Sequence, residues 1–308
     1  MPASGVVITG AGIVSPLGLD REKTFAAVLE GRCGITRLTA IDCELPEDRD
    51  GGEAPALPDD FEPNLPREAR YLRKAILDAL GESGLRADGR IAGKRCGIII
   101  GTTLHGMRAA GEFLRSNDAG HLSRFLASHV VEAAASDLGF DRFAATTCSA
   151  CSSSLGSIAL GVTMLESGEF DVIIAGGYDP ISEYAYAGFN SLRLVAGGPL
   201  RPFARDREGM KVSEGYGIVI LERAKGAADR GARPLAQIAG FGESADAHHL
   251  TQPHPEGEGA ARAMQQAIAS SGLRPGEINL LVAHATGTPD NDASEYAAMS
   301  RVFGEALP

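Results

Sequence analysis

Short apolar runs alternate with helical patterns along most of this chain. Apolar runs of about four to eight residues between turn signals predict buried strands, and apolar residues three and four apart predict helices. Strands are expected after Gly5 and at Cys96–Gly101, Arg142–Thr147, Asp171–Ala175, Val212–Glu222, 235–241 and 278–283. Helices are expected at Arg21–Glu30, Arg67–Glu82, 107–116, 124–138, Cys151–Glu166, 224–230, 258–272 and 291–304. This alternation predicts an α/β fold with a mostly parallel sheet.

One helical pattern is apolar on every side. From Cys151 to Glu166, apolar residues recur at helical spacing, and Leu160 and Met164 occupy the opposite side. Such a pattern is typical of a buried helix, so we expect this helix to be covered all round. Residues 42–66 differ, because five prolines and a run of acidic residues predict a long exposed loop there.

Length and charge narrow the classes of function. At roughly 150 residues per domain, 308 residues suggest about two domains, and a chain of this size needs no disulfide or metal to stabilise its core. The formal net charge is −11; nine acidic residues and one arginine between Asp42 and Glu62 contribute −8, which leaves −3 elsewhere. We do not expect nucleic-acid binding, because phosphates need clustered Lys and Arg. An acidic protein partner remains compatible with the rest of the surface.

The cysteines and the amino terminus indicate a compartment. The number of cysteines is odd, no basic and long apolar leader opens the chain, and no run of 18 apolar residues occurs. We therefore expect a cytoplasmic, reduced protein with no membrane partner. No cofactor is expected. The five cysteines are Cys33, Cys43, Cys96, Cys148 and Cys151.

The segment Ala144-Ala-Thr-Thr-Cys-Ser-Ala-Cys-Ser-Ser-Ser154 carries the clearest chemical signal. An expected strand runs into small residues, and Cys151 falls where the next helix begins. Unpaired N–H groups and the helix dipole at that end favour an anion, so a thiol there becomes a better nucleophile. Two other interpretations stay open: Cys151 is a small buried apolar residue, or it forms a redox pair with Cys148. A zinc site lacks a second cysteine pair or a matching histidine spacing.

A second candidate is His284, in Val282-Ala-His-Ala-Thr-Gly-Thr-Pro289. The expected strand at 278–283 delivers this histidine at its carboxyl end, where ligands bind in α/β folds. A neutral imidazole there can transfer a proton or hydrogen-bond a developing negative charge. The alternative is a histidine whose ring bonds only to the backbone of the turn.

Two further motifs favour structural interpretations. Gly10-x-Gly12 lacks the third small residue of a dinucleotide-binding loop, because Ser15 stands there, and it predicts a tight turn instead. Three histidines without supporting Cys or carboxylate spacing favour a polar loop over a metal site. These are His248, His249 and His254.

Two charged segments complete the survey. Arg67, Arg70, Arg73 and Lys74 share one face of an expected helix. Such a face is usually solvated, and it could also dock an acidic partner. The charged stretch Arg201–Gly217 is expected to be a structural loop that enters a strand.

Taken together, these segments resemble the β-ketoacyl-acyl carrier protein synthase family, of the elongating type found in fatty acid and polyketide synthesis. The resemblance runs over nearly the whole chain. Its motifs are, in chain order, Val6-Val-Ile-Thr-Gly-Ala-Gly-Ile-Val-Ser-Pro-Leu-Gly18, Ala150-Cys-Ser-Ser-Ser154, Gly168-Glu-Phe-Asp-Val-Ile-Ile-Ala-Gly-Gly177, Arg201-Pro-Phe203, Glu214-Gly-Tyr-Gly217 and Ala283-His-Ala-Thr-Gly-Thr-Pro289. The spacing from the cysteine motif to the strand after it selects Cys151 over Cys148.

The resemblance implies a thiolase-type fold, in which two similar halves stack as five alternating layers, αβαβα. Residues 1–231 would form the half with the nucleophilic cysteine, and residues 232–308 an incomplete second half with the first catalytic histidine. The resemblance also implies a homodimer, or a heterodimer with another ketosynthase subunit.

The resemblance implies a reaction as well. Cys151 would accept an acyl group from an acyl carrier protein as a thioester. A malonyl-carrier would then lose carbon dioxide, and the resulting carbanion would attack that thioester. His284 corresponds to the first of two family histidines that support decarboxylation and bind the malonyl thioester carbonyl. Glu295 matches a position that holds the loop after this histidine.

The sequence departs from the family in two places. The segment between Gly139 and Cys151 is shorter than usual, and Cys148 is an unusual occupant. The chain ends at Pro308, whereas the family continues into a strand with a lysine and a second histidine, and then into a Phe-Gly-rich loop that completes the oxyanion hole. Since one missing oxyanion donor costs ~10²–10³ in rate, we expect impaired condensation and a chain that is part of a longer enzyme or is completed elsewhere.

These observations predict a 3-oxoacyl-acyl carrier protein synthase, an acyltransferase with Cys151 and His284 as catalytic residues. Its partners would be acyl carrier proteins that carry acyl and malonyl groups. The alternative is a non-condensing partner subunit similar to a chain length factor; the retained Cys151 counts against it, and the missing second histidine counts for it. A thiol oxidoreductase is a third hypothesis, which needs a reversible disulfide between Cys148 and Cys151.

Overall fold

A computed structural model describes residues 5–41, 50–85, 91, 93–138, 143–304 and 307–308, which form two compact units. The larger unit is Gly5–Ala187 with Val212–Gln237, and the smaller unit is Gly188–Lys211 with Ile238–Pro308. In these residues no helix is both long enough and apolar enough to cross a membrane.

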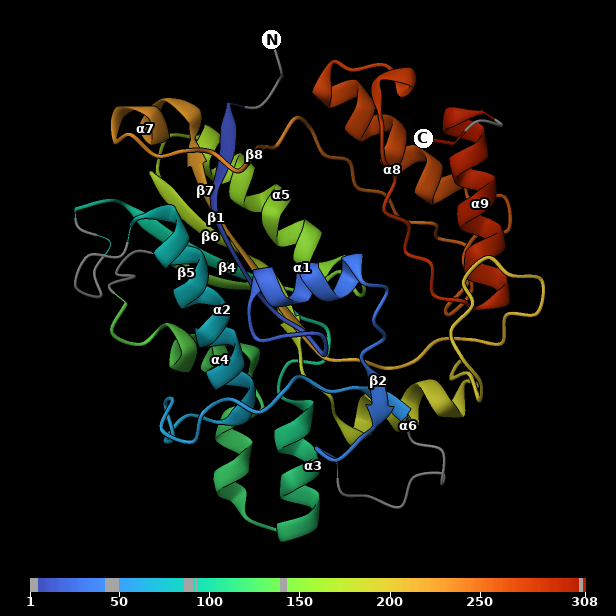
Figure 1. Ribbon diagram of the computed structural model, residues 1–308, viewed down its shortest axis with the longest axis horizontal. Helices are drawn as coiled ribbons and strands as arrows, with labels where there is room; N and C mark the ends of the chain where they lie inside the picture. The colour runs from blue at the N-terminus through green and yellow to red at the C-terminus, as the bar shows by residue number, and fades with distance from the viewer. Residues whose placement is uncertain (1–4, 42–49, 86–90, 92, 139–142, 305–306) are drawn as a thin grey trace. The chain divides into compact units, whose positions relative to one another are not determined.

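The larger unit is built on a six-stranded sheet (Figure 1). β4 runs parallel to β5 and β6, whereas the other three ladders are antiparallel, so the prediction of a mostly parallel sheet is wrong. Because Asp179 pairs with Gly215, the chain leaves β6 and enters β7 at the same end of the sheet, and β7 runs antiparallel. The strands are β1 (Val6–Val14), β4 (Cys96–Gly101), β5 (Phe143–Thr147), β6 (Val172–Asp179), β7 (Gly215–Arg223) and β8 (Ala236–Gln237), in the order β5-β4-β6-β7-β1-β8.

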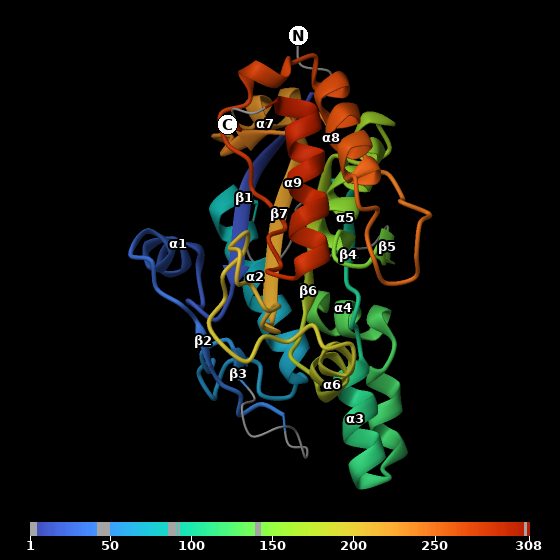
Figure 2. The same cartoon turned by 90° about the vertical axis from the view of Figure 1, so that its right-hand side faces the viewer.

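Helices cover both faces of this sheet (Figures 1 and 2). α2 (Arg67–Ser83) packs on one face, where Ile98 of β4 joins its apolar core. α5 (Ser153–Glu166) packs on the other face, where Gly161 lies against Ile173. Successive side chains of a strand point to opposite faces, so continuous apolar runs serve both layers. The α/β prediction is confirmed.

α5 is less covered than its sequence predicts. Val162 and Leu165 are fully buried, whereas Leu155 is 70% exposed and Leu160 is 37% exposed. The expectation of a helix covered all round is therefore wrong. Within the larger unit, the sheet packs against only one side of this helix (Figure 1).

Gly10 and Gly12 lie inside β1 rather than in a turn, so that prediction is also wrong. A Cβ atom at Gly10 would stand 2.1 Å from the carbonyl oxygen of Ala79, and one at Gly12 would stand 2.0 Å from that of Ala75. Without Cβ atoms at these two positions, the backbone of α2 can lie directly on β1. The glycines therefore serve close packing.

The other elements of the larger unit mostly follow the sequence pattern. The helices predicted at Arg21–Glu30, 107–116 and 224–230 are confirmed as α1, α3 and α7. The helix predicted at 124–138 is present as the shorter α4. Residues 42–49 of the expected acidic loop lie outside the described residues, and β3 pairs with β2 beside them. The elements are α1 (Arg21–Leu29), β2 (Ile35–Arg37), β3 (Asp50–Gly52), α3 (Met107–Ser116), the 3-10 helix η1 (Ala119–Arg124), α4 (Ala127–Ala135) and α7 (Ala224–Asp229), while α6 (Glu183–Ser191) spans both units.

The basic residues of α2 are part of the internal structure. Arg73 is only 6% exposed, and its guanidinium group donates to Glu62, to Asp137 and to two backbone carbonyls of residues 134–136. Arg67 donates both terminal nitrogens to the carboxylate of Glu214. The expected solvated or docking face is therefore wrong. Arg70 and Lys74 also have internal partners, the carbonyls of Pro58 and Phe61 and the carboxylate of Asp78.

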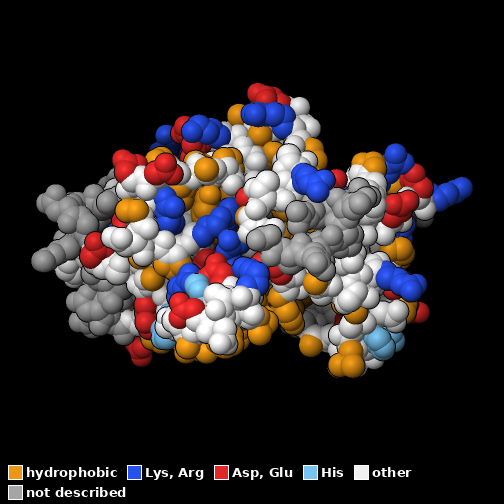
Figure 3. Space-filling model, turned by 90° about the horizontal axis from the view of Figure 1, so that it is seen from below, with side chains coloured by type: hydrophobic (Ala, Val, Ile, Leu, Met, Phe, Trp, Pro, Cys, Tyr) orange, Lys and Arg blue, Asp and Glu red, His pale blue; other side chains and the backbone are white. Residues whose placement is uncertain are grey.

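The surface of the described residues mixes charges of both signs. On the face seen in Figure 3, Lys and Arg side chains lie next to Asp and Glu side chains. Glu112 illustrates the pairing, since both Arg108 and Arg124 approach its carboxylate, at 3.6 and 2.8 Å. Among the described residues of this face, charges of the two signs are therefore interspersed.

Asp171 gives the larger unit a dependence on acid pH. Hydrogen bonds from Arg95 and then from Arg223 hold the pKa of its carboxyl well below the ordinary range. A carboxyl with a lowered folded-state pKa stabilises the fold above its unfolded pKa, and this contribution is lost as the pH falls below about 4. Asp171→Asn should therefore weaken the loss of unfolding free energy between about pH 4 and pH 2, measured by urea titration at each pH.

A matched control is Asp78→Asn. The Asp78 side chain is 31% exposed, close to the 29% of Asp171, and it pairs with the single amine of Lys74. If the two variants change the acid dependence equally, the two arginines are not the cause.

The smaller unit contains two long helices, α8 (Glu258–Ser271) and α9 (Pro289–Phe303), and the 3-10 helix η2 (Pro275–Glu277). The helix predictions at 258–272 and 291–304 are confirmed. The strand prediction at 278–283 is wrong, because no described residue pairs with that segment in a ladder. The predicted strand at 235–241 shortens to β8, since Phe241 instead exchanges hydrogen bonds with the hydroxyl of Ser270 on α8.

Candidate functional site

Cys151 lies in a tight turn between β5 and α5. The strand ends at Thr147, and the helix begins at Ser153 with Ser152 as its N-cap. Ala150 has a φ of 50°, a left-handed conformation that non-glycine residues seldom adopt. Cys151 is exposed, and Cys148 nearby is an exposed free thiol. The interpretation of Cys151 as a small buried residue is therefore wrong.

Hydroxyl groups hold this turn. Ser153, which is 3% exposed, accepts a hydrogen bond from the backbone N–H of Ser149 at 2.9 Å and donates to the carbonyl of Ala150 at 2.6 Å. The hydroxyl of Thr103, just beyond β4, donates to the same carbonyl at 2.7 Å. The backbone before Cys151 is thus tied both to its own helix and to a neighbouring strand.

Two glycines allow the first turn of α5 to pack closely on the sheet. Gly101 of β4 and Gly177 of β6 are paired neighbours. A Cβ atom at Gly101 would stand 2.1 Å from the carbonyl oxygen of Ser153, and one at Gly177 would stand 2.1 Å from the hydroxyl of Ser154. The position of Cys151 along the edge of the sheet is therefore set by close packing of the first turn of α5 on these two glycines.

Gly101→Ala should displace the turn that carries Cys151. The new methyl group meets backbone atoms of Ser153, which cannot rotate away, so we expect a loss of about 1–3 kcal/mol in unfolding free energy. The rate at which iodoacetamide alkylates Cys151 should also change in this variant. Gly188→Ala is the control, because a Cβ there meets nothing within 4 Å. If Gly101→Ala and Gly188→Ala change stability and Cys151 alkylation equally, the packing of α5 on Gly101 is not tight.

The carboxylate of Asp179 organises the turn after β4. One of its oxygens accepts from the hydroxyl of Thr102 at 2.8 Å and from the N–H groups of Thr103 and Leu104 at 2.9 and 2.7 Å. Burial raises the pKa of Asp179, and these three hydrogen bonds oppose the rise. The sequence analysis missed Thr103 and Asp179. Their signal is a polar residue at the carboxyl end of each of two strands: Asp179 is the last residue of β6, and Thr103 is the second residue after β4. The carboxyl ends of parallel strands meet at one edge of a sheet.

The turn is suited to nucleophilic chemistry. The Cys151 side chain is exposed immediately before the N-terminus of a helix of 14 residues. The positive end of the helix dipole favours a thiolate there and an oxyanion formed beside it.

His284 follows the segment 278–283 in the smaller unit, and it is exposed. Glu295, on α9, holds the backbone at this point: one carboxylate oxygen accepts from the N–H of His284 at 2.6 Å, and the other from the N–H of Ala285 at 2.9 Å. Ala285 has a φ of 50°, so a second left-handed residue lies beside a candidate catalytic side chain. Glu295 holds the loop, as the resemblance implies.

Asp292 fixes the rest of this loop. It is 1% exposed and accepts from the N–H of Gly287 at 3.1 Å and from the N–H of Phe203 at 2.7 Å. Arg207 approaches its carboxylate at 3.6 Å and donates to the carbonyl of Pro289 at 2.6 Å. The charged stretch from Arg201 is therefore structural, as predicted.

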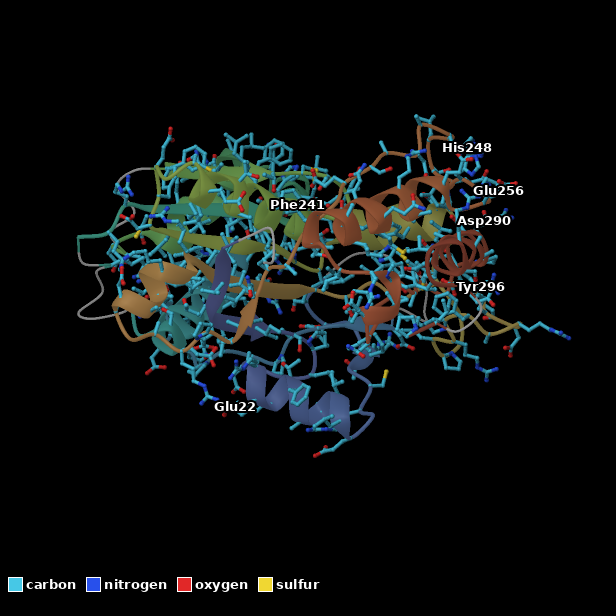
Figure 4. The ribbon with its side chains drawn as sticks, turned by 90° about the horizontal axis from the view of Figure 1, so that it is seen from above. Glu22, Phe241, His248, Glu256, Asp290 and Tyr296 are labelled. Atoms are coloured by element: carbon cyan, nitrogen blue, oxygen red, sulfur yellow. The ribbon has the colours of Figure 1, made fainter. Side chains whose placement is uncertain are left out.

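A cavity of about 590 Å³ adjoins this loop within the smaller unit. Ala283, next to His284, is one of its lining residues, and apolar side chains of α9 form much of the wall. Tyr296, labelled in Figure 4, is one of them. The cavity lining also includes Phe203, Leu281 and Met299.

The three histidines before α8 form a polar loop. His248 and His254 contact each other edge to face, with ring centroids 4.9 Å apart, and His248 is exposed (Figure 4). Among the described residues, no group of three His, Cys, Asp or Glu side chains is arranged to hold a metal ion. Cys151 belongs to the larger unit and His284 to the smaller unit, so each site is defined by its own unit.

Two family profiles match the chain. The N-terminal domain of beta-ketoacyl synthase matches residues 3–227, and its C-terminal domain matches residues 235–307. A 3-oxoacyl-[acyl-carrier-protein] synthase 2 from Staphylococcus aureus (strain N315) is 33% identical, over 98% of this chain and 77% of its own. A mitochondrial 3-oxoacyl-[acyl-carrier-protein] synthase from Arabidopsis thaliana is 32% identical, over 97% of this chain and 74% of its own.

Solved structures of the same kind resemble the fold. The ishigamide ketosynthase/chain length factor superposes with a TM-score of 0.89 at 31% identity, covering 98% of this chain and 78% of its own. A beta-ketoacyl synthase from Burkholderia phymatum STM815 gives 0.84 at 28% identity, covering 99% and 79%. A ketosynthase in complex with its chain length factor, from Xenorhabdus doucetiae, gives 0.80 at 28% identity, covering 99% and 77%.

Proposed function

Because this chain belongs to the β-ketoacyl synthase family, we propose that it is a 3-oxoacyl-acyl carrier protein synthase with Cys151 as its nucleophile. The observation that carries the proposal is the exposed cysteine at the start of α5, in a strained and multiply hydrogen-bonded turn. Strain of this kind persists only where the surroundings over-determine it, and it is concentrated at functional sites.

The first step is acyl transfer. The Cys151 thiolate attacks the carbonyl carbon of an acyl-carrier thioester and forms a new sulfur–carbon bond. The sulfur–carbon bond to the carrier then breaks, and the carrier leaves as a thiolate, which takes up a proton from water. The start of α5 would stabilise both the attacking thiolate and the oxyanion of the tetrahedral intermediate.

The second step is condensation. A malonyl-carrier thioester loses carbon dioxide, and the electron pair of the broken bond forms an enolate. His284 would hydrogen-bond the developing negative charge on the thioester oxygen, in the position that Glu295 and Asp292 maintain. The enolate carbon then attacks the acyl-Cys151 carbonyl, a carbon–carbon bond forms, and the cysteine thiolate leaves.

The test is intact-mass analysis after incubation with a medium-chain acyl-carrier protein. We expect one acyl group per chain, carried on the peptide with Cys151. Addition of malonyl-carrier should then release the acyl group only slowly as a 3-oxoacyl-carrier product, in keeping with the impaired condensation that the sequence predicts. A folded chain that takes up no acyl group under these conditions would contradict the proposal.

A second candidate function is a non-condensing partner subunit. It is supported by the similarity to the ishigamide ketosynthase/chain length factor. Such a subunit would form a stable heterodimer with an active ketosynthase and change the chain length of its products, and Cys151 would be dispensable. Product chain lengths with wild-type and Cys151→Ala chains distinguish the two functions.

The proposal extends to the binding partner, the oligomeric assembly and the cellular compartment. We propose an acyl carrier protein as the partner, a homodimer or a ketosynthase heterodimer as the assembly, and the cytoplasm as the compartment. Relatives named as synthases of acyl-carrier substrates support the partner. The two matched ranges, 3–227 and 235–307, support a nucleophile half at 1–231 and a second half at 232–308.

A further inference from the structure

The turn before Cys151 depends on one carbonyl group. Ala150 is left-handed, a conformation that is disfavoured for a residue with a Cβ atom. Its carbonyl oxygen accepts three hydrogen bonds: from the Thr103 hydroxyl at 2.7 Å, from the Ser153 hydroxyl at 2.6 Å and from the Ser153 N–H at 3.1 Å. These bonds fix the peptide plane between Ala150 and Cys151, and so the direction in which the cysteine side chain leaves the backbone.

Only one of these donors comes from outside the turn. Ser153 is three residues along the chain and moves with α5, whereas Thr103 is 47 residues away, at the end of β4. The Thr103 and Ser153 hydroxyls also lie 3.3 Å apart. Thr103 is therefore the donor that connects this carbonyl group to the carboxyl end of β4.

Thr103 is itself held in place. The carboxylate of Asp179 accepts from its N–H at 2.9 Å and from the Thr102 hydroxyl and the Leu104 N–H on either side. With its backbone fixed by three bonds to one oxygen, the Thr103 side chain has little freedom to turn away from Ala150. A continuous path of hydrogen bonds runs from β6 through Thr103 to the turn that carries Cys151.

We propose that Thr103 is a positioning residue for Cys151: its hydroxyl, held by the carboxylate of Asp179, fixes the Ala150 carbonyl and with it the direction of the cysteine thiol. This inference rests on the proposed function, in which Cys151 is the nucleophile. Thr103 itself would contact neither acyl group nor carrier.

The test compares Thr103→Val, which keeps the shape and removes the hydroxyl, with Thr103→Ser, which restores the hydroxyl. The control is Thr163→Val on α5, where the hydroxyl donates to the Ala159 carbonyl at 3.1 Å. The readouts are the rate of acyl loading and the rate of Cys151 alkylation by iodoacetamide over a pH series. Fragment-ion mass spectrometry separates Cys151 from Cys148 and from the distant Cys33.

Thr103→Val should slow acyl loading and the high-pH plateau of Cys151 alkylation by about fivefold to tenfold, the effect expected for one lost hydrogen bond. Thr103→Ser should recover most of both rates. Alkylation of Cys33 should not change, and Thr163→Val should behave as the wild type. Asp179→Ala should reproduce the defect without adding to that of Thr103→Val, because both act on the same path.

Two outcomes would overturn the inference. Rates for Thr103→Val within twofold of the wild type would show that the hydroxyl does not position Cys151. Equal slowing at Cys33 would show a general loss of structure instead. The proposed function fails separately: if the wild type takes up no acyl group while Cys151 alkylation still responds to Thr103→Val, the positioning role stands and the synthase proposal falls.

Discussion

Cys151→Ala is expected to abolish acyl loading of the chain, with a loss of roughly 10⁴-fold or more in rate, because the variant lacks the proposed nucleophile. The variant should fold normally, since Cys151 is exposed and its Cβ atom is retained. Intact-mass analysis after incubation with acyl-carrier protein measures the effect directly, and thermal unfolding checks the fold.

Cys148→Ala is the matched control. This thiol is exposed, lies three residues away and belongs to the same turn, so it sees the same reagents. The variant should load acyl groups at close to the wild-type rate. Loss of loading in Cys148→Ala together with full activity in Cys151→Ala would reverse the assignment. Loss in both, with an intramolecular disulfide in the oxidised wild type, would favour the thiol oxidoreductase hypothesis.

Glu214→Ala is expected to cost about 3–5 kcal/mol of unfolding free energy, the largest effect on stability among these substitutions. The Glu214 side chain is fully buried and accepts two hydrogen bonds from Arg67 and one from the N–H of Ala54 at 2.8 Å. Its carboxylate also accepts a hydrogen bond from the Tyr216 hydroxyl at 3.3 Å, and the ring of Tyr216 stacks on the ring of Tyr71. Removing the carboxylate leaves the Arg67 charge, which is only 21% exposed, without its main partner.

Two other variants serve as comparisons for this prediction. Glu214→Gln keeps the shape and one acceptor oxygen, so its loss should be smaller and measurable even if Glu214→Ala does not fold. Asp229→Ala removes an exposed partner of Lys225 and should cost less than about 1 kcal/mol. Urea titration of all three gives the comparison. A Glu214→Ala loss as small as that of Asp229→Ala would show that the buried pair contributes little.

Local patterns predicted most elements of the larger unit. α1, α2, α3 and β4 are where the sequence places them, because each pattern reflects burial of one face or of a whole strand. Strand direction was not predictable in this way. An apolar run such as Val212–Glu222 is the same in either direction, and only the pairing of Asp179 with Gly215 makes β7 antiparallel.

The predictions failed where a distant segment decides the outcome. Gly10 and Gly12 resemble a turn locally, yet they lie in a strand because the carbonyl groups of α2 take the space of their side chains. The arginines of α2 resemble a solvated face, yet Arg73 is buried because acceptors 61 to 64 residues along the chain surround it. The segment 278–283 has a strand pattern, but a strand also needs a partner.

The sequence by itself determined the α/β class, the order of most helices and strands, and the two motifs that carry Cys151 and His284, since these depend on residue type and short spacing. The tertiary structure alone decided how Cys151 is held. Thr103, Asp179 and the paired glycines Gly101 and Gly177 come from strands far apart in the sequence. They meet because the carboxyl ends of β4 and β6 share one edge of the sheet, a proximity that no local spacing encodes.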